Sequence, residues 1–449
     1  MARVTDMTHG RPIRLILLFS LPLMLGSVFQ QLYTIVDTII IGRGVGMQAL
    51  ASIGAADWIN WLVLWGLQGF TQGFAILAAQ EFGAGAYDRL RRVLAMIVKL
   101  SCWFGIAVTI ISLLLVRPLL TLLRTDPAVF GGAQTYLYVQ FGGSLIIIAY
   151  NMAAAVLRCL GDSRTPLLAI LAASFANIAL DLLFVMGFGW GIFGASFATV
   201  LAQLIAFLLC LRSLRRLPFV QLTKADWKTD PAILLHLCRL GIPTGLQMSM
   251  ITLGGMVLQS VLNGFGVVFV AGYTAANNIF GFLYVTVNAV TQACMSFTSQ
   301  NYGVGKWKRM ERVLIDCLIL SFAAMMVLGN GAYFFGPQLL HIYTSSDAVI
   351  KCGMEILLYT TVTYFLCGFM DLFPGALRGM GHSGVPMLLS IIGTVGTRIV
   401  WIYWIFPRHR SLAVLFISYP ASWIITLAMQ IVCYFYVRKM LYKKIANKK

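Results

Sequence analysis

Long apolar runs separated by short polar connections dominate the chain. Each run has about 20 residues or more, which is enough for an α-helix to cross the hydrocarbon core of a bilayer. The pattern predicts an all-α polytopic membrane protein with twelve transmembrane helices and no separate soluble domain. The predicted spans are 13–41, 53–79, 93–116, 133–157, 166–188, 190–211, 236–262, 268–298, 313–335, 353–377, 386–406 and 412–437.

Composition supports this reading. Hydrophobic residues make up 59% of the 449 residues and charged residues 11%, with a mean hydropathy of +0.85. A soluble domain carries about 25% charged residues. The first apolar run is too long for a secretory signal and lacks a small-residue cleavage site, so we expect no cleaved leader.

The net charge of +18 is unevenly distributed along the chain. If the N-terminus is cytoplasmic, the large majority of the 33 Lys and Arg residues fall on the cytoplasmic side of the spans. This asymmetry predicts a multi-pass protein of the cell membrane (plasma or bacterial inner) with both termini in the cytoplasm. We expect the basic tail Arg438–Lys449 to contact anionic lipid headgroups rather than nucleic acid.

The sequence offers no signal for a cofactor. The nine cysteines are dispersed without a CxxC pair, and the phosphate-binding pattern GxxxxGK[ST] is absent. No nucleophile–base pair or metal-ligand set lies within the apolar runs, so we do not expect an enzyme. An ion gradient is the energy source that remains, unless a partner chain hydrolyses ATP.

Two pairs of loops repeat at one offset of 220 residues. Gln80–Leu94 resembles Gln300–Leu314, and Leu157–Pro166 resembles Leu377–Pro386. We therefore predict a duplicated six-helix unit, with lobes at residues 1–215 and 232–449 and a cytoplasmic interlobe loop at 216–231. Because six is even, the repeat is parallel, and rocking of the two lobes would give alternating access.

Three acidic residues lie well inside apolar runs: Asp37, Asp181 and Asp371. A carboxylate at bilayer depth costs several kcal/mol unless it is neutralised, paired or hydrated. Asn177 precedes Asp181 by one helical turn on the same face, and Thr199 comes from the next span. By their distance from the span ends, Asp37, Asn177, Asp181 and Thr199 all fall in the outer half of the membrane.

These four side chains predict a cation-coupling site. Carboxylate, amide and hydroxyl oxygens suit Na⁺, and two adjacent acids in a low dielectric can equally hold a proton. The alternative is a structural one, in which Asn177 and Asp181 only form hydrogen bonds to neighbouring helices. Pro22 is expected to bend the first span, either as a static kink or as a bend coupled to Asp37.

The chain resembles the MATE (multidrug and toxic compound extrusion) family. The resemblance rests on Pro22-x14-Asp37, Asn177-x3-Asp181 and Thr199, with the paired loops Gln80–Gly85 and Gln300–Gly305. It implies two six-helix lobes, a cation site at Asp37, Asn177, Asp181 and Thr199, and export of organic cations in exchange for Na⁺ or H⁺. The second lobe departs from some branches because span 7 has no acid and Asp371 is not clearly at the family position.

A substrate cleft and an intramembrane ion pair are further expectations. Asp371 and Arg398 are expected to form a structural pair; otherwise Asp371 contacts a cationic substrate and Arg398 lines the cavity. Aromatic faces attract cations and methionines adapt to varied ligands, although the same residues fill ordinary helical cores. The candidate cleft residues are Tyr33, Gln247, Met248, Met250, Phe280, Tyr284, Asn288 and Met295.

The function that these features favour is a secondary active antiporter that exports organic cations or drugs in exchange for H⁺ or Na⁺. The alternative on the same fold is a flippase or exporter of a lipid-linked or anionic metabolite, which Arg398 would support. The expected partners are a small-molecule substrate and the lipid bilayer, with no nucleic acid, and we expect a monomer.

Overall fold

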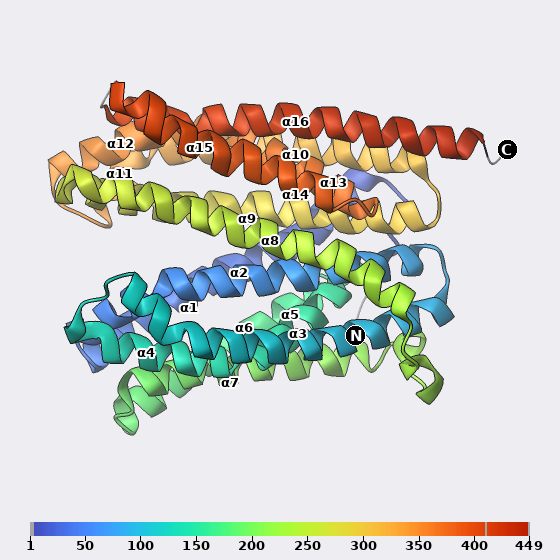
Figure 1. Ribbon diagram of the computed structural model, residues 1–449, viewed down its shortest axis with the longest axis horizontal. Helices are drawn as coiled ribbons and strands as arrows, with labels where there is room; N and C mark the ends of the chain where they lie inside the picture. The colour runs from blue at the N-terminus through green and yellow to red at the C-terminus, as the bar shows by residue number, and fades with distance from the viewer. Residues whose placement is uncertain (1–3, 409–410, 448–449) are drawn as a thin grey trace. The chain divides into compact units, whose positions relative to one another are not determined.

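The computed structural model describes residues 4–408 and 411–447, and within these ranges the regular structure is helical, without strands (Figure 1). The helices of the first half are α1 (Pro12–Gly44), α2 (Met47–Gly83), α3 (Tyr87–Leu122), α4 (Pro127–Gly142), α5 (Ser144–Cys159), α6 (Arg164–Asp181), η1 (Leu182–Gly187), α7 (Gly191–Leu214), η2 (Pro218–Val220) and η3 (Lys224–Trp227). Those of the second half are α8 (Pro231–Leu262), η4 (Asn263–Phe265), α9 (Val267–Gly303), α10 (Trp307–Phe334), α11 (Gly336–His341), α12 (Asp347–Thr361), α13 (Tyr364–Gly379), α14 (Gly384–Ser390), η5 (Ile391–Gly396), α15 (Thr397–Val400), η6 (Trp401–Ile405), η7 (Phe406–Arg408) and α16 (Leu412–Ala446).

The helices have the length and composition of membrane spans. In the described part of the chain, nine helices are long and apolar enough to cross a membrane, or up to eleven if each of two bent pairs counts as one span. The bent pairs are α4 with α5, at 49°, and α12 with α13, at 44°. The 32-residue helix α8 occupies the predicted seventh span. The predicted all-α membrane fold is confirmed.

The internal repeat is visible in the backbone. α2 and α9 begin at Met47 and Val267, and α3 and α10 at Tyr87 and Trp307, each pair 220 residues apart. Glycines with positive φ recur at the same offset, as Gly85 (70°) and Gly305 (74°), Gly161 (87°) and Gly381 (85°), and Gly46 (112°) and Gly266 (93°). Such φ values favour glycine because a Cβ would clash. The two-lobe repeat is thus confirmed.

Two compact units make up the structure. One contains residues 4–7 and Leu21–Gly245, and the other contains Thr8–Ser20 and the described residues from Leu246 onward. α1 and α8 both pass from one unit to the other within their length. Pro22 and Pro243 lie close to these two crossing points, inside their helices.

In the first unit, α2 packs closely on the first half of α8 through four glycines. A Cβ built on Gly69 would lie 2.7 Å from the Thr244 carbonyl oxygen, and one on Gly73 would lie 2.6 Å from the Gly241 Cα. Gly241 and Gly245 receive the rings of Phe74 and Phe70 in turn. Two small-x-x-x-small pairs therefore face each other, as in closely packed membrane helices.

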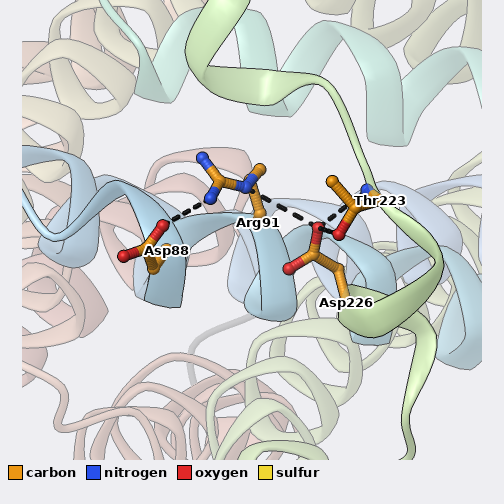
Figure 2. Close-up of polar contacts among 4 residues, drawn as sticks. All are labelled: Asp88, Arg91, Thr223 and Asp226. Atoms are coloured by element: carbon orange, nitrogen blue, oxygen red, sulfur yellow. Dashed lines mark hydrogen bonds and ion pairs between the residues drawn. The ribbon is translucent and has the colours of Figure 1, made fainter.

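The loop between the two halves is fastened to α3 (Figure 2). The Asp226 carboxylate accepts hydrogen bonds from the Thr223 backbone N–H (2.8 Å) and hydroxyl (2.7 Å), and Arg91 Nε lies 3.6 Å from the same oxygen. Arg91 also pairs with Asp88 on α3. Burial alone would raise the pKa of Asp226, but the Thr223 hydrogen bonds and nearby arginines outweigh it and lower the pKa.

The second unit has its core among α9, α10, α12, α13 and α16, with residues of the last part of α8. Fully buried members include Phe416, Leu258 and Met325. The N-terminal segment is attached to this unit, because Lys306 Nζ donates to the Thr8 carbonyl (2.8 Å) and Arg309 donates to the carbonyls of His9 and Gly10 (both 2.8 Å).

Candidate functional site

Asp37 projects from the middle of a polar stretch of α1. Its neighbours Thr34 and Thr38 donate to carbonyls of their own helix, Gln30 O (2.9 Å) and Thr34 O (2.8 Å), so neither hydroxyl proton is available to it. The carboxyl oxygen Oδ1 of Asp37 is buried without a hydrogen-bond partner. No donor of the described structure therefore pairs with this oxygen.

Asp181 and Asn177 occupy one face of α6, one turn apart. Asp181 is fully buried and Asn177 is 1% exposed. Both carboxyl oxygens of Asp181 and both amide atoms of Asn177 lack hydrogen-bond partners. Leaving buried polar atoms unpaired costs about 1–3 kcal/mol each, and more for a charge. Because buried polar atoms are normally hydrogen-bonded, this cluster is a candidate binding site, and its role as a cation site stays a prediction.

Asp37 and Asp181 lie close enough for their carboxyl groups to interact directly. When both are ionised, each can only accept hydrogen bonds, so neither satisfies the other. A proton shared between them, or a cation held by both, removes the repulsion. The structure thus brings together two of the predicted coupling residues, with Asn177 one turn along the same helix.

Thr199 is half-buried on α7, and its hydroxyl donates to the Ala195 carbonyl (3.2 Å). The hydroxyl oxygen can still accept or coordinate. No contact of Thr199 with the two aspartates is recorded, so its role as a cation ligand stays a prediction. Tyr33 lies one turn before Asp37 on α1, and its hydroxyl interacts electrostatically with both Asp37 and Asp181.

Apolar side chains of four elements close around the polar group. They come from α1, α2, η1 and α7, and they form one buried cluster with partly buried neighbours on the same elements and on α6. Its members are Ile40, Ile41, Ala49, Val185 and Ala195, with Val36, Ile53, Ile178 and Ile192 packed against it. Val36 and Ile178, the sequence neighbours of Asp37 and Asn177, thus pack against this buried apolar cluster.

The helix geometry changes at Asp181. α6 ends there, and the next six residues, Leu182–Gly187, form the π-helical turn η1. A π turn frees backbone groups from the regular ladder and is rare outside functional sites. The same geometry recurs in the second unit at Trp401–Ile405, so it belongs to the repeated fold as well as to this site.

A further acid, Asp57 on α2, was missed by the sequence reasoning. The predicted span began at residue 53, so Asp57 lay close to its start and was not counted among the acids well inside a span, whereas α2 begins at Met47 and carries Asp57 about three turns in. Asp57 interacts electrostatically with Asp37. The Ala-Ala-Asp that interrupts an otherwise small and apolar stretch was the available signal.

In the second unit, Arg398 has partners other than the one predicted. Its guanidinium lies 4.2 Å from the ring centroid of Tyr419, and Nε donates to the Ser422 hydroxyl (3.3 Å). Asp371 instead has Arg378 as its cationic neighbour. The expected Asp371–Arg398 ion pair is not among the ion pairs of the described residues, because equal depth on two helices does not fix which faces meet.

Arg378 is the unexpected residue of this unit. The sequence placed it in a loop, but it is 4% exposed in the last turn of α13 and donates to the Gln247 side-chain oxygen (2.9 Å). Its Nε is buried without a partner. Tyr284 interacts electrostatically with Asp371 and Arg378, and Asn288 accepts from Gln292.

The remaining cleft candidates have mixed environments. Phe280 and Met295 are buried, and Phe280 stacks on Tyr364 in the core with centroids 6.2 Å apart, so core packing explains it. Met248 and Met250 are half-buried. The predicted cleft itself, which would need Tyr33 of the first unit together with residues of the second, stays a prediction.

Comparisons with known proteins converge on one family. A family model described as MatE matches residues 22–183 and, again, residues 243–404. The probable multidrug resistance protein YpnP of Bacillus subtilis is 32% identical over 394 residues, which cover 86% of this chain and 87% of that protein. The probable multidrug resistance protein NorM of Thermotoga maritima is 25% identical over 382 residues, or 83% of this chain and 81% of the other.

A solved structure shares the fold. A MOP superfamily transporter from Pyrococcus furiosus superposes with a TM-score of 0.89 at 24% identity, covering 98% of each chain. At this identity, the likeness concerns the fold alone.

Proposed function

The chain belongs to the MATE family, and from this premise we propose that it exports organic cations, drugs among them, in exchange for H⁺ or Na⁺ by alternating access. We place it in the cell membrane with both termini in the cytoplasm. The observation that supports the proposal is the interacting carboxyl pair Asp37–Asp181 with Asn177, in which one oxygen of Asp37 and all side-chain polar atoms of Asp181 and Asn177 are buried without a hydrogen-bond partner.

The mechanism follows from the charge of this pair. With both carboxylates ionised, the pair repels itself in a low-dielectric site and favours an arrangement that separates or hydrates it. With a proton or Na⁺ bound, the charges are compensated and the surrounding apolar cluster can close. A cation that binds the two arrangements with different affinity shifts their populations, and substrate binding to the other arrangement completes the exchange.

Efflux from proteoliposomes under separate gradients tests the proposal. A fluorescent organic cation is followed while a pH gradient or a Na⁺ gradient is imposed alone, at zero membrane potential. We expect one of the two gradients to drive substrate uphill. Substrate movement that follows only its own gradient under both conditions would refute the antiport proposal.

The second candidate function, transport of a lipid-linked or anionic metabolite, has one observation in its favour. Arg378 is buried beside the cleft candidate Gln247 and has an unpartnered Nε, which suits an anion. Asp371 lies near it and offsets its charge, which favours the cation proposal. Competition for efflux by cationic compounds and not by anionic ones would support the first proposal, and the reverse result would support the second.

Arg378→Met distinguishes the two candidates further. If Arg378 serves only to balance Asp371, the single variant leaves an uncompensated buried carboxyl and costs about 3–5 kcal/mol, which Arg378→Met with Asp371→Leu recovers. Thermal melting of the single and double variants measures this. If Arg378 instead binds an anionic substrate, the double variant regains stability and loses anion transport.

A further inference from the structure

Beside the Asp37–Asp181 pair lies a second polar group, contributed by α2 and α4. Asp57 and Asn60 are one helical turn apart on α2, and the Asn60 side-chain N–H donates to the Tyr136 hydroxyl on α4 (3.1 Å). Ala56, Ile59, Ala133 and Leu137, which flank these residues in sequence, form a buried cluster with Val116, Leu120 and Phe141. The group therefore sits on a packed interface rather than on a flexible surface.

A glycine sets the close approach of these two helices. A Cβ on Gly132 of α4 would lie 2.4 Å from the Ser52 hydroxyl oxygen of α2. Gly132 precedes Tyr136 by four residues, and Ser52 precedes Asn60 by eight, so both residues lie on the facing sides. Close packing at Gly132 thus brings Tyr136 within hydrogen-bond reach of Asn60.

The amide oxygen of Asn60 is a candidate ligand-binding atom. Its side chain is 4% exposed, and the amide oxygen is buried without a hydrogen-bond partner. An amide oxygen left unpaired in a dry interface is costly unless a donor or cation occupies it. Oxygen atoms of an amide, a carboxylate and a phenol are ligands that a small hard cation prefers.

The polar group on α2 and α4 interacts electrostatically with the Asp37–Asp181 pair, through Asp37. Asp57 and Tyr136 both interact electrostatically with Asp37, and Tyr136 also interacts with Tyr33. Neither an arginine nor a lysine is among the groups that influence Asp57 or Tyr136 in the described chain. No three His, Cys, Asp or Glu side chains of the described residues are close enough to hold one metal ion. Asp57 is therefore a neighbour of the carboxyl pair, not a third ligand of one shared ion.

We propose that Asp57, Asn60 and Tyr136 form a second holding position for a small monovalent cation, H⁺ or Na⁺, so that the protein takes up two coupling cations per transport cycle. The proposal rests on the antiport function proposed above. Its physical reason is charge: three carboxylates in one low-dielectric region, without a basic partner, need more than one positive charge for neutrality.

The reversal point of exchange measures the number of coupling cations. Proteoliposomes with a clamped zero membrane potential receive a tenfold gradient of H⁺ or of Na⁺, and the opposing substrate gradient is varied until net flux stops. Two cations balance about a hundredfold substrate gradient and one cation about tenfold, because each tenfold gradient adds the same free energy per cation. We expect about hundredfold for the wild type and about tenfold for Asp57→Asn and Asn60→Ala. The exposed-residue control Asp347→Asn should match the wild type.

Direct binding keeps the test independent of transport. In one arm, the full-length protein in detergent is titrated with ²²Na⁺ at fixed pH, which gives the number of Na⁺ ions bound per protein. In the other arm, a pH dye in Na⁺-free buffer reports the number of protons that the protein takes up. Two cations bound by the wild type and one by Asp57→Asn, in whichever arm responds, support the proposal. One cation bound by the wild type, or an unchanged count in Asp57→Asn that elutes as a folded monodisperse species, overturns it. Absence of gradient-driven flux with two cations bound would instead refute the antiport proposal alone.

Discussion

At the residue scale, Asp181 is a fully buried carboxyl group of the first unit. Its two oxygens and both amide atoms of Asn177 are buried without hydrogen-bond partners, an arrangement that costs free energy unless a ligand compensates it. A ligand that binds only the folded state stabilises it, by about 2.7 kcal/mol at a concentration a hundred times its dissociation constant. Stability should therefore depend on the coupling cation.

Asp181→Asn should weaken that dependence. An amide carries no charge to neutralise, so we expect the melting temperature of the variant to rise less than that of the wild type when the coupling cation, Na⁺ or H⁺, is added; the response that remains would come from the second cation position proposed above. Differential scanning fluorimetry in detergent measures both. Asp347→Asn serves as the matched control. A variant that still responds as the wild type does would mean that the cation binds elsewhere.

Sequence reasoning found the costly acids but not all their neighbours. Asp37 and Asp181 stand out because charges are scarce in apolar runs, and the structure does place their carboxyl groups together. Asp57 was not identified because the predicted start of α2 was too late in the chain. Arg378 was not identified because basic residues near span ends usually face the lipid headgroups. Partner choice, as for Arg398 with Tyr419, depends on helix rotation, which span depth does not determine.

At the element scale, close helix packing through glycine is the feature that a hydropathy pattern hides. α2 contains Gly54, which has open space around it, and Gly73, which touches α8. The two positions allow the same substitution to be compared within one helix.

Gly73→Leu should destabilise the protein by about 1–3 kcal/mol, because the new side chain must push α8 away from α2. Gly54→Leu should be neutral or stabilising by up to about 1 kcal/mol, since leucine favours a helix more than glycine does. Melting temperatures of the two purified variants check the contrast. Equal melting temperatures would show that the α2–α8 contact contributes nothing to stability.

The interlobe loop offers a prediction outside the membrane. Asp226→Asn removes the charge that Arg91 faces, so residues 218–229 should exchange amide hydrogens faster than in the wild type. Because the pKa of Asp226 is lowered in the folded protein, its contribution is complete above the ordinary value of about 4 and is lost as the pH falls through the lowered value.

Hydrogen exchange of peptides from this loop, corrected for intrinsic rates, measures the effect at neutral and acid pH. Asp230→Asn is the control, since asparagine also caps the start of α8 as Asp230 does. If the loop of Asp226→Asn is as protected as that of the wild type, the Arg91 contact is not what holds it.

Element boundaries were readable only in part. The predicted span began at residue 133, whereas α4 begins at Pro127, where Asp126 caps it by accepting from the Ala128 N–H (2.8 Å). The break at Gly143 was not predicted. A Cβ there would lie 2.5 Å from a Val200 methyl group, so the cause is packing against α7, far along the chain.

At the scale of the whole molecule, the helices repeat between the two halves of the chain, whereas the candidate coupling residues do not. Helix bounds, bent pairs and positive-φ glycines repeat at an offset of 220, as the loop sequences predicted. The coupling residues do not repeat: Asp181 corresponds to Trp401, Thr199 to Tyr419 and Asn60 to Phe280. Duplication therefore explains the architecture, and local substitution explains why we expect cation coupling in the first unit only. The lobe boundaries 1–215 and 232–449 stay a prediction.

The most direct test of the account is substrate efflux by Asp37→Asn in the proteoliposomes described above. Under the gradient that drives the wild type, we predict that uphill efflux by Asp37→Asn is lost, while Asp347→Asn transports as the wild type does. Substrate binding to the purified Asp37→Asn protein should persist, because the substitution removes coupling and not the fold. Uphill efflux by Asp37→Asn at the wild-type rate would contradict the central claim that the Asp37–Asp181 pair couples a cation to export.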